Sequence, residues 1–239
     1  MKLRSILLIF FIASVSSHAQ NMRIREIKPD FYVYTTYNYY NGALVPSNSM
    51  YVVTTEGVVM IDTPWKAEEL LPLLDSIQRK HKQKVVLCIS THYHADRTAG
   101  LELLNLNGIK TYTSRMTWDL SGKYGEKQAS HAFSNDTTFI VGNHAFQTYY
   151  PGEGHTKDNI VVWFGKERIL YGGCFIKSTE ATGLGNVADA NIKAWPISMK
   201  NTIIKFPAPD IVIPGHQAWS DNKSRESTLK LLKNNAEKK

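Results

Sequence analysis

Short runs of aromatic and β-branched residues mark most of the strands expected in the first half of this chain. Residues 31–36 and 50–55 are of this kind, and a Thr55-Glu56-Gly57 turn leads from the second run into a third at 58–62. Runs of this composition bounded by turn residues predict strands and hairpins. An uninterrupted apolar run at 85–89 predicts a buried strand.

Helices are expected where apolar residues recur at helical spacing. The apolar residues on one side of the first helix are Leu70, Leu71, Leu74 and Ile77. Pro72 must then lie near the first turn of that helix or bend it. Further helices are expected at 97–106, within 191–205 and from about residue 224 onward. Because Pro196 interrupts the second of these, that helix is kinked or starts late.

The second half repeats the order of strands followed by helices. Its predicted strands are 137–141, 145–150, 160–164, 169–171 and 211–213. Strands cluster within each half, and helices follow them. We therefore expect an α/β fold in which two similar halves pack sheet against sheet with helices outside, an αββα sandwich. A single domain would span residues 20–239, with its halves divided near 125–135.

The first 19 residues have the pattern of a secretory signal peptide. Lys2 and Arg4 precede a short apolar segment, and Ser17-His18-Ala19 places small residues before a cleavage site. No apolar run approaches the roughly 20 residues that span a bilayer, and no cysteine follows the cleavage site as a lipid anchor. We expect a soluble exported protein with no stable membrane association, periplasmic in a Gram-negative bacterium.

The charge balance changes this picture little. The formal net charge is +7, and it becomes +5 without Lys2 and Arg4. A basic chain can indicate nucleic-acid binding, but no nucleic-acid motif and no interleaved basic and aromatic groove is present. Part of the excess lies in lysines near the C-terminus, as on a solvated surface. We expect no nucleic-acid partner.

The chain contains two cysteines, Cys88 and Cys174. In an exported protein a disulfide is the first alternative to weigh. Cys88, however, lies inside the apolar run at 85–89, as a small core residue does. Cys174 follows two glycines, which permit a close approach of the backbone to another group. We favour two unpaired thiols, with Cys174 held as a thiolate by a metal.

The clearest chemical signal is the segment His92-Tyr93-His94-Ala95-Asp96, which begins soon after the strand at 85–89. On extended backbone, alternate side chains share one face, so these two imidazoles and the carboxylate can converge on a point. Imidazole and carboxylate groups are good ligands for zinc. The simpler alternative is a polar turn in which Asp96 caps the following helix.

Three further candidate ligands, His155, Cys174 and His216, lie at the ends of predicted strands. Loops at one edge of a sheet gather into a common site. Six ligands are too many for one tetrahedral zinc ion and suit two ions with three protein ligands each. Such ions retain open positions for water and substrate, which is typical of catalytic sites. Structural zinc sites are closed and usually contain several thiolates.

With these residues in this order, the sequence resembles the class B metallo-β-lactamases of subclass 1. The resemblance covers the mature chain and includes Ile61-Asp62-Thr63-Pro64-Trp65 and Gly172-Gly173-Cys174-Phe175-Ile176-Lys177. It implies a monomer that binds two Zn²⁺ ions. The implied ligands of one ion are His92, His94 and His155. The implied ligands of the other are Asp96, Cys174 and His216.

Two positions separate the sequence from most hydrolases of the wider superfamily. Arg97 stands where those enzymes have a histidine ligand, and Cys174 stands where they have a bridging aspartate. Both differences favour the lactamases. The alternatives are a hydrolase of the same fold acting on a lactone or thioester, and a non-catalytic exported zinc-binding protein. A non-catalytic zinc-binding protein would have no need of open coordination positions on its zinc ions.

The resemblance implies hydrolysis of the lactam amide of penicillins, cephalosporins and carbapenems, and hence antibiotic resistance. Zinc lowers the pKa of bound water to about 7, so a hydroxide on the metal is the expected nucleophile. Asp96 would orient this group or relay its proton. Lys177 would bind the substrate carboxylate, and Asn186 would donate a hydrogen bond to the carbonyl oxygen. The simpler alternatives are an exposed lysine and a turn asparagine.

Aromatic residues around an expected hairpin tip at 38–43 complete the predicted site. Tyr40, together with Tyr39, Val45 and Trp65, would form an apolar wall over the substrate. Ordinary strand packing is the alternative for the tyrosines. Asp62 and Arg97 would orient the ligands from behind.

Overall fold

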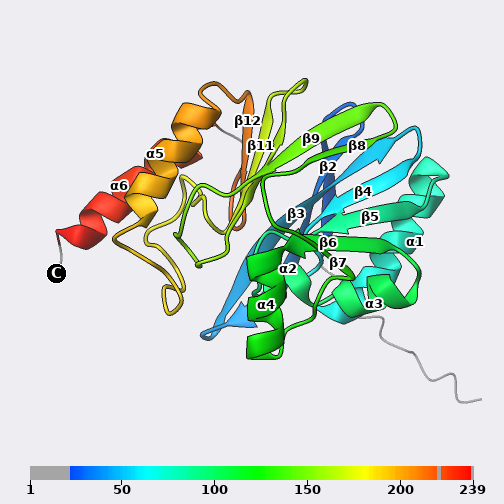
Figure 1. The fold of residues 1–239 in the computed structure, drawn as a ribbon, viewed down its shortest axis with the longest axis horizontal. Coiled ribbons are helices and arrows are strands. Elements are labelled where there is room, and N and C mark those ends of the chain that lie inside the picture. Colours follow the sequence, from blue (N-terminus) through cyan, green and yellow to red (C-terminus); the bar gives the residue numbers. More distant parts are fainter. Residues whose placement is uncertain (1–21, 220–221, 238–239) are drawn as a thin grey trace, which may run out of the picture.

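A computed structural model describes residues 22–219 and 222–237, so the expected signal peptide at 1–19 lies outside the described residues. Two β-sheets pack face to face, with helices on their outer sides (Figure 1). This arrangement confirms the predicted αββα sandwich. In the described part of the chain, no helix has both the length and the apolar character needed to cross a membrane.

The first sheet contains seven of the described strands, in the order of the sequence. Strands β1 to β4 pair antiparallel, whereas β4 to β7 pair parallel. The strands are β1 (Arg23–Lys28), β2 (Phe31–Tyr40), β3 (Ala43–Thr54), β4 (Gly57–Ile61), β5 (Val85–Ile89), β6 (Lys110–Ser114) and β7 (His131–Phe133). The helices among them are η1 (Ala67–Glu69), α1 (Leu70–His81), α2 (Ala95–Thr98), α3 (Leu101–Leu106) and α4 (Arg115–Tyr124).

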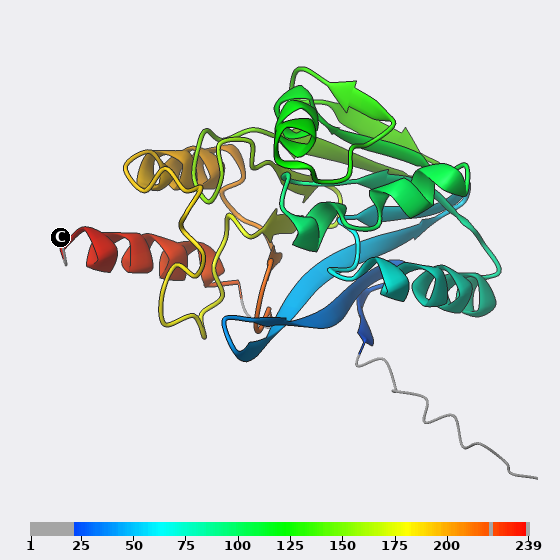
Figure 2. The same ribbon diagram turned by 90° about the horizontal axis from the view of Figure 1, so that it is seen from below.

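The second sheet is built from five described strands in the order β12-β11-β10-β9-β8, with only β11 and β12 parallel. These strands are β8 (Thr138–Val141), β9 (His144–Tyr149), β10 (Val161–Phe164), β11 (Ile169–Gly173) and β12 (Ile211–Pro214). Helices α5 (Trp195–Lys205) and α6 (Ser224–Ala236) pack together beside this sheet. They lie at the opposite end of the molecule from α1 (Figures 1 and 2).

The core lies in two layers around the first sheet because its strands alternate between two buried faces. On β2, Phe31 and Val33 face the second sheet, while Tyr32 and Tyr34 belong to the cluster that includes α1. Phe31 meets Phe164 of the second sheet edge-on, with ring centroids 5.2 Å apart. A further apolar cluster joins the second sheet to α5 and α6. The apolar cluster between the two sheets therefore fixes them relative to each other.

Some predicted elements differ in detail. The single helix expected at 97–106 is two helices, α2 and α3, which are separated around Gly100. A Cβ on Gly100 would lie 3.0 Å from Thr63 Cβ, so the chain passes unusually close to its neighbour there. In α1, Leu71 is 50% exposed and Leu73 is buried instead. Pro196 lies at the start of α5, so this helix starts late rather than being kinked.

Candidate metal centre

The six predicted ligands lie at the same edge of the two sheets, five of them on loops, whereas Asp96 lies in the first turn of α2 and not on extended backbone. His92, His94 and Asp96 follow β5, and Cys174 directly follows β11. His155 lies between β9 and β10, and His216 follows β12. His94, not Asp96, is the N-cap residue of α2, and it makes no side-chain cap hydrogen bond. The capping alternative for Asp96 is therefore wrong.

Three imidazoles form one part of the centre. The ring centroids of His92, His94 and His155 lie 4.9, 5.0 and 5.1 Å apart, with the rings nearly perpendicular. His92 Nε2 and His155 Nδ1 are buried and have no hydrogen-bond partner among the described residues. Burial lowers the pKa of both imidazoles well below the usual value, so they are neutral at pH 7. Neutral imidazoles without partners are suited to bind a metal.

A carboxylate, a thiol and an imidazole form the other part. Cys174 Sγ lies 3.3 Å from Asp96 Oδ2 and 3.1 Å from His216 Nε2. His216 Nδ1 is 2.7 Å from the carbonyl oxygen of Pro46, which leaves Nε2 facing the group. Burial opposes a charge on His216, but Cys174 and Asp96 outweigh it and raise the pKa of His216 to about 9.

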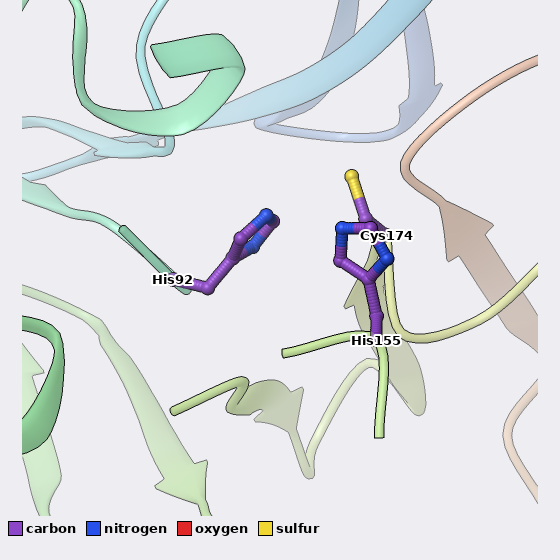
Figure 3. A group of neighbouring side chains, drawn as sticks. All are labelled: His92, His155 and Cys174. Atoms are coloured by element: carbon purple, nitrogen blue, oxygen red, sulfur yellow. The ribbon is translucent and has the colours of Figure 1, made fainter. Parts of the chain in front are cut away.

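The two parts adjoin. Potential ligand atoms of His92, His155 and Cys174 lie within 4.8 Å of one another, as do those of His92, His94 and Asp96. In Figure 3 the ring of His92 points across the site toward His155 and Cys174. Buried nitrogens without partners beside a thiol and a carboxylate fit the donor set that zinc prefers. The residues present therefore fit a zinc centre.

Arg97 and Asp62 lie behind the candidate ligands, as the sequence indicated. Arg97 Nη2 donates to Asp96 Oδ2 at 2.9 Å and to Cys174 Sγ at 3.1 Å. Burial alone would raise the pKa of Asp96, but the Arg97 guanidinium together with His216 and His92 outweighs burial and holds this pKa well below its usual range. Asp62 accepts hydrogen bonds from both the backbone and the hydroxyl of Thr91. This fixes the turn that carries His92.

A contact of His94 was missed from the sequence. Asp189 Oδ2 lies 3.0 Å from His94 Nε2, although the two residues are 95 positions apart. This bond leaves Nδ1 of His94 for a metal. The only signal was the position of Asp189 in the same polar loop as Asn186.

A cavity of about 1020 Å³ opens onto the candidate ligands. It is lined by His94, Asp96, His155, Cys174 and His216, and by the predicted substrate-binding residues Tyr40, Trp65, Lys177 and Asn186. The Trp65 ring lies between Tyr40 and His216, with centroid distances of 6.3 and 5.8 Å. Asn186 Oδ1 accepts from the backbone of Ala188, as a turn asparagine does. The structure thus places all the predicted site residues in or directly beneath one cavity.

Comparison with known proteins gives consistent results. Residues 42–237 match the metallo-beta-lactamase superfamily. The metallo-beta-lactamase type 2 of Elizabethkingia meningoseptica is 42% identical over 211 residues, covering 88% of this chain and 85% of the relative. Metallo-beta-lactamase IND-1 of Chryseobacterium indologenes is 36% identical over 230 residues, covering 93% and 96%. A solved metallo-beta-lactamase from Pontibacter korlensis has a TM-score of 0.87 at 37% identity, covering 89% and 99%.

These matches extend over nearly all of the described residues and over most of each relative. They agree with the sandwich fold and with the cluster of histidine, aspartate and cysteine side chains at its edge. The predicted family and the predicted class of enzyme, a metal-dependent hydrolase, are confirmed. This chain belongs to the metallo-beta-lactamase superfamily.

Proposed function

We propose that this protein is a zinc-dependent β-lactamase that hydrolyses the lactam amide of penicillins, cephalosporins and carbapenems. The observation that carries the proposal is the group of three imidazoles that adjoins the group of Asp96, Cys174 and His216 at a cavity of about 1020 Å³. Its relatives named metallo-beta-lactamase, at 36% and 42% identity, support the same reaction. We further propose export through the signal at 1–19, a periplasmic location and a monomeric single domain at 20–239.

In this proposal the protein holds two Zn²⁺ ions. The ligands of the first ion are His92, His94 and His155. The ligands of the second ion are Asp96, Cys174 and His216. When bound, zinc supplies Lewis acidity and makes water acidic enough to react near neutral pH.

The remaining site residues act on the substrate. Lys177 binds the carboxylate beside the lactam nitrogen, and Asn186 donates to the lactam carbonyl oxygen as negative charge develops there. Asp96 orients the attacking water or accepts its proton. Tyr40 and Trp65 contact the apolar side chain of the substrate and exclude solvent from one side of the cavity.

Imipenem hydrolysis by the purified mature protein tests the proposal. Activity should disappear with EDTA and return when Zn²⁺ is added, and elemental analysis should give two zinc ions per chain. A parallel assay compares nitrocefin with a thioester. Turnover of the thioester alone would favour the other hydrolase, and zinc binding without any turnover would favour the non-catalytic zinc-binding protein.

A further inference from the structure

Lys177 is a buried cation that has no carboxylate partner in the described part of the chain. The residue is 8% exposed, and the ion pairs formed by the described residues do not include it. A buried ammonium group without a counterion is costly unless another group stabilises its charge. Another group near Lys177 must therefore stabilise its charge when no substrate is bound.

The group that faces this ammonium is an indole ring. Lys177 Nζ lies over Trp195, 5.3 Å from the ring centroid. The face of an aromatic ring attracts a cation through its quadrupole, and tryptophan does so most strongly. Unlike a carboxylate, the ring stabilises the cation without neutralising it. The charge therefore remains available for an anion that enters the cavity.

The ring itself is held in one orientation. Trp195 is fully buried at the start of α5, and its Nε1 donates to the carbonyl oxygen of Phe175 at 3.0 Å. The rings of Trp195 and Phe175 stack with centroids 6.1 Å apart. On another side, a Cβ on Gly154 would lie 3.0 Å from Trp195 Cδ1. The indole is packed too closely to turn away from Lys177.

The backbone of Lys177 is fixed from the neighbouring helix α6. Its N–H donates to Thr228 Oγ1 at 2.8 Å, and its carbonyl oxygen lies 3.4 Å from the same hydroxyl. Helices α5 and α6 pack against each other (Figure 1), so one helix holds the backbone and the other faces the ammonium. A Cβ on Gly185, which lines the cavity, would lie 3.9 Å from Lys177 Nζ. The ammonium is thus placed at the cavity wall.

We propose that Trp195 is a positioning residue for substrate binding, whose ring face holds the unneutralised Lys177 ammonium for the substrate carboxylate. This inference rests on the proposed function, because it assigns Lys177 to that carboxylate. Trp195 acts through Lys177 and does not line the cavity itself. The Trp195 ring also lies 5.9 Å from the His155 ring, centroid to centroid, so the part of its effect that depends on Lys177 is the part that belongs to binding of the anionic group.

The kinetic test compares Trp195→Leu and Trp195→Phe with the wild type, on a cephalosporin and on its methyl ester. For the acid, Trp195→Leu should raise KM about three- to tenfold with kcat little changed. Trp195→Phe, which retains a ring face, should have a smaller effect. KM for the ester should not change. In a Lys177→Ala background, Trp195→Leu should add nothing further to KM for the acid.

Equal increases in KM for acid and ester, or equal effects with and without Lys177, would show a merely structural role and overturn the inference. If the leucine variant does not fold, the phenylalanine variant carries the same comparison. A lack of lactam turnover by the wild type would overturn the proposed function instead.

A second readout does not depend on activity. In a ¹H–¹³C spectrum of the wild type, the ring of Trp195 should shift the Lys177 Cε methylene upfield. That signal is identified by its loss in Lys177→Ala, and it should move downfield in Trp195→Phe because the smaller ring lies farther away. A Lys177 methylene at the ordinary lysine position in the wild type would overturn the contact.

Discussion

His216 illustrates how neighbouring charges determine the protonation of one candidate ligand. It lies within 3.3 Å of both Cys174 and Asp96, and its pKa is raised to about 9. His92 and His155 lie in the same centre, but burial lowers their pKa values. Imidazoles of the same centre therefore carry different charges in the metal-free protein.

We expect zinc binding to the group of Asp96, Cys174 and His216 to release a proton from His216 at pH 7, because the metal displaces it. Above pH about 9 this proton is already absent. In the metal-free protein the same raised pKa stabilises the fold below the ordinary histidine pKa near 6.5. This contribution is lost as the pH rises through about 9. Calorimetric zinc titrations in buffers of different ionisation enthalpy measure the released protons. Equal release at pH 7 and pH 9.5 would contradict the assignment.

Cys174→Ser should weaken one zinc site selectively, because a hydroxyl replaces a thiolate at the centre. We expect bound zinc to fall from two ions to about one, and lactam turnover to fall by about 100-fold or more. Cys88→Ala is the matched control, since Cys88 is buried in β5 and lies outside the candidate ligand groups. Two retained ions in the serine variant would rule out Cys174 as a ligand.

At the scale of residues, the sequence identified side chains whose metal-binding chemistry follows directly from their residue type. Histidine, aspartate and cysteine at strand ends indicate metal binding even when the conformation of the loops is unknown. Asp189 and Trp195 were not identified because their roles arise from contacts with His94 and Lys177, which are not their neighbours in the sequence. Nothing in their local sequence distinguishes them from a loop aspartate and a core tryptophan.

At the scale of elements, the hairpin of β2 and β3 is longer than its pattern predicts. The strands continue to Tyr40 and resume at Ala43, so the tip is only Asn41 and Gly42. Both tip residues have positive φ angles, 49° and 78°, as a tight hairpin turn requires. The hairpin thereby carries Leu44 to the edge of the cavity.

Leu44→Ala should raise KM for lactams with a large apolar side chain by about threefold, because less apolar area is buried on binding. Its effect on substrates with a small side chain should be slight. Leu44 is 46% exposed and lines the cavity. Leu106→Ala is the control, since Leu106 is 77% exposed on α3 and does not line the cavity. Equal effects of the two substitutions on KM would contradict this role.

The elements that the sequence did not reveal are mainly polar ones. Strand β6 buries Thr111 and Thr113 completely. Thr111 finds hydrogen-bond partners in Asn105 and Ser130. Buried threonines of this kind, one of them with its hydroxyl satisfied by neighbouring segments, leave no hydrophobic period in the sequence. Such a strand can be recognised only in the folded structure, where its hydrogen-bond partners lie beside it.

At the scale of the whole molecule, Arg97 connects the two sheets. Besides Asp96 and Cys174, it donates to the carbonyl oxygens of Asn48 in β3 and Gly215 beyond β12. The sequence predicted two packed layers from the order of strands and helices. It did not predict that one buried guanidinium joins them, because that depends on how the sheet edges meet.

Arg97→Met should destabilise the protein by about 3–5 kcal/mol, since it leaves Asp62 and Asp96 buried without their cation. Urea unfolding of the metal-free proteins measures this loss. Arg79→Met is the control, because the ion pair that Arg79 forms with Asp75 within α1 is exposed. Its effect should be within about 0.5 kcal/mol. A comparable small effect at position 97 would contradict the role assigned to that residue.

The three-imidazole group takes His92 and His94 from the edge of one sheet and His155 from the edge of the other. An ion shared by these rings would cross-link the two sheets at this edge, so the sheets could part there only after its bonds to one side are broken.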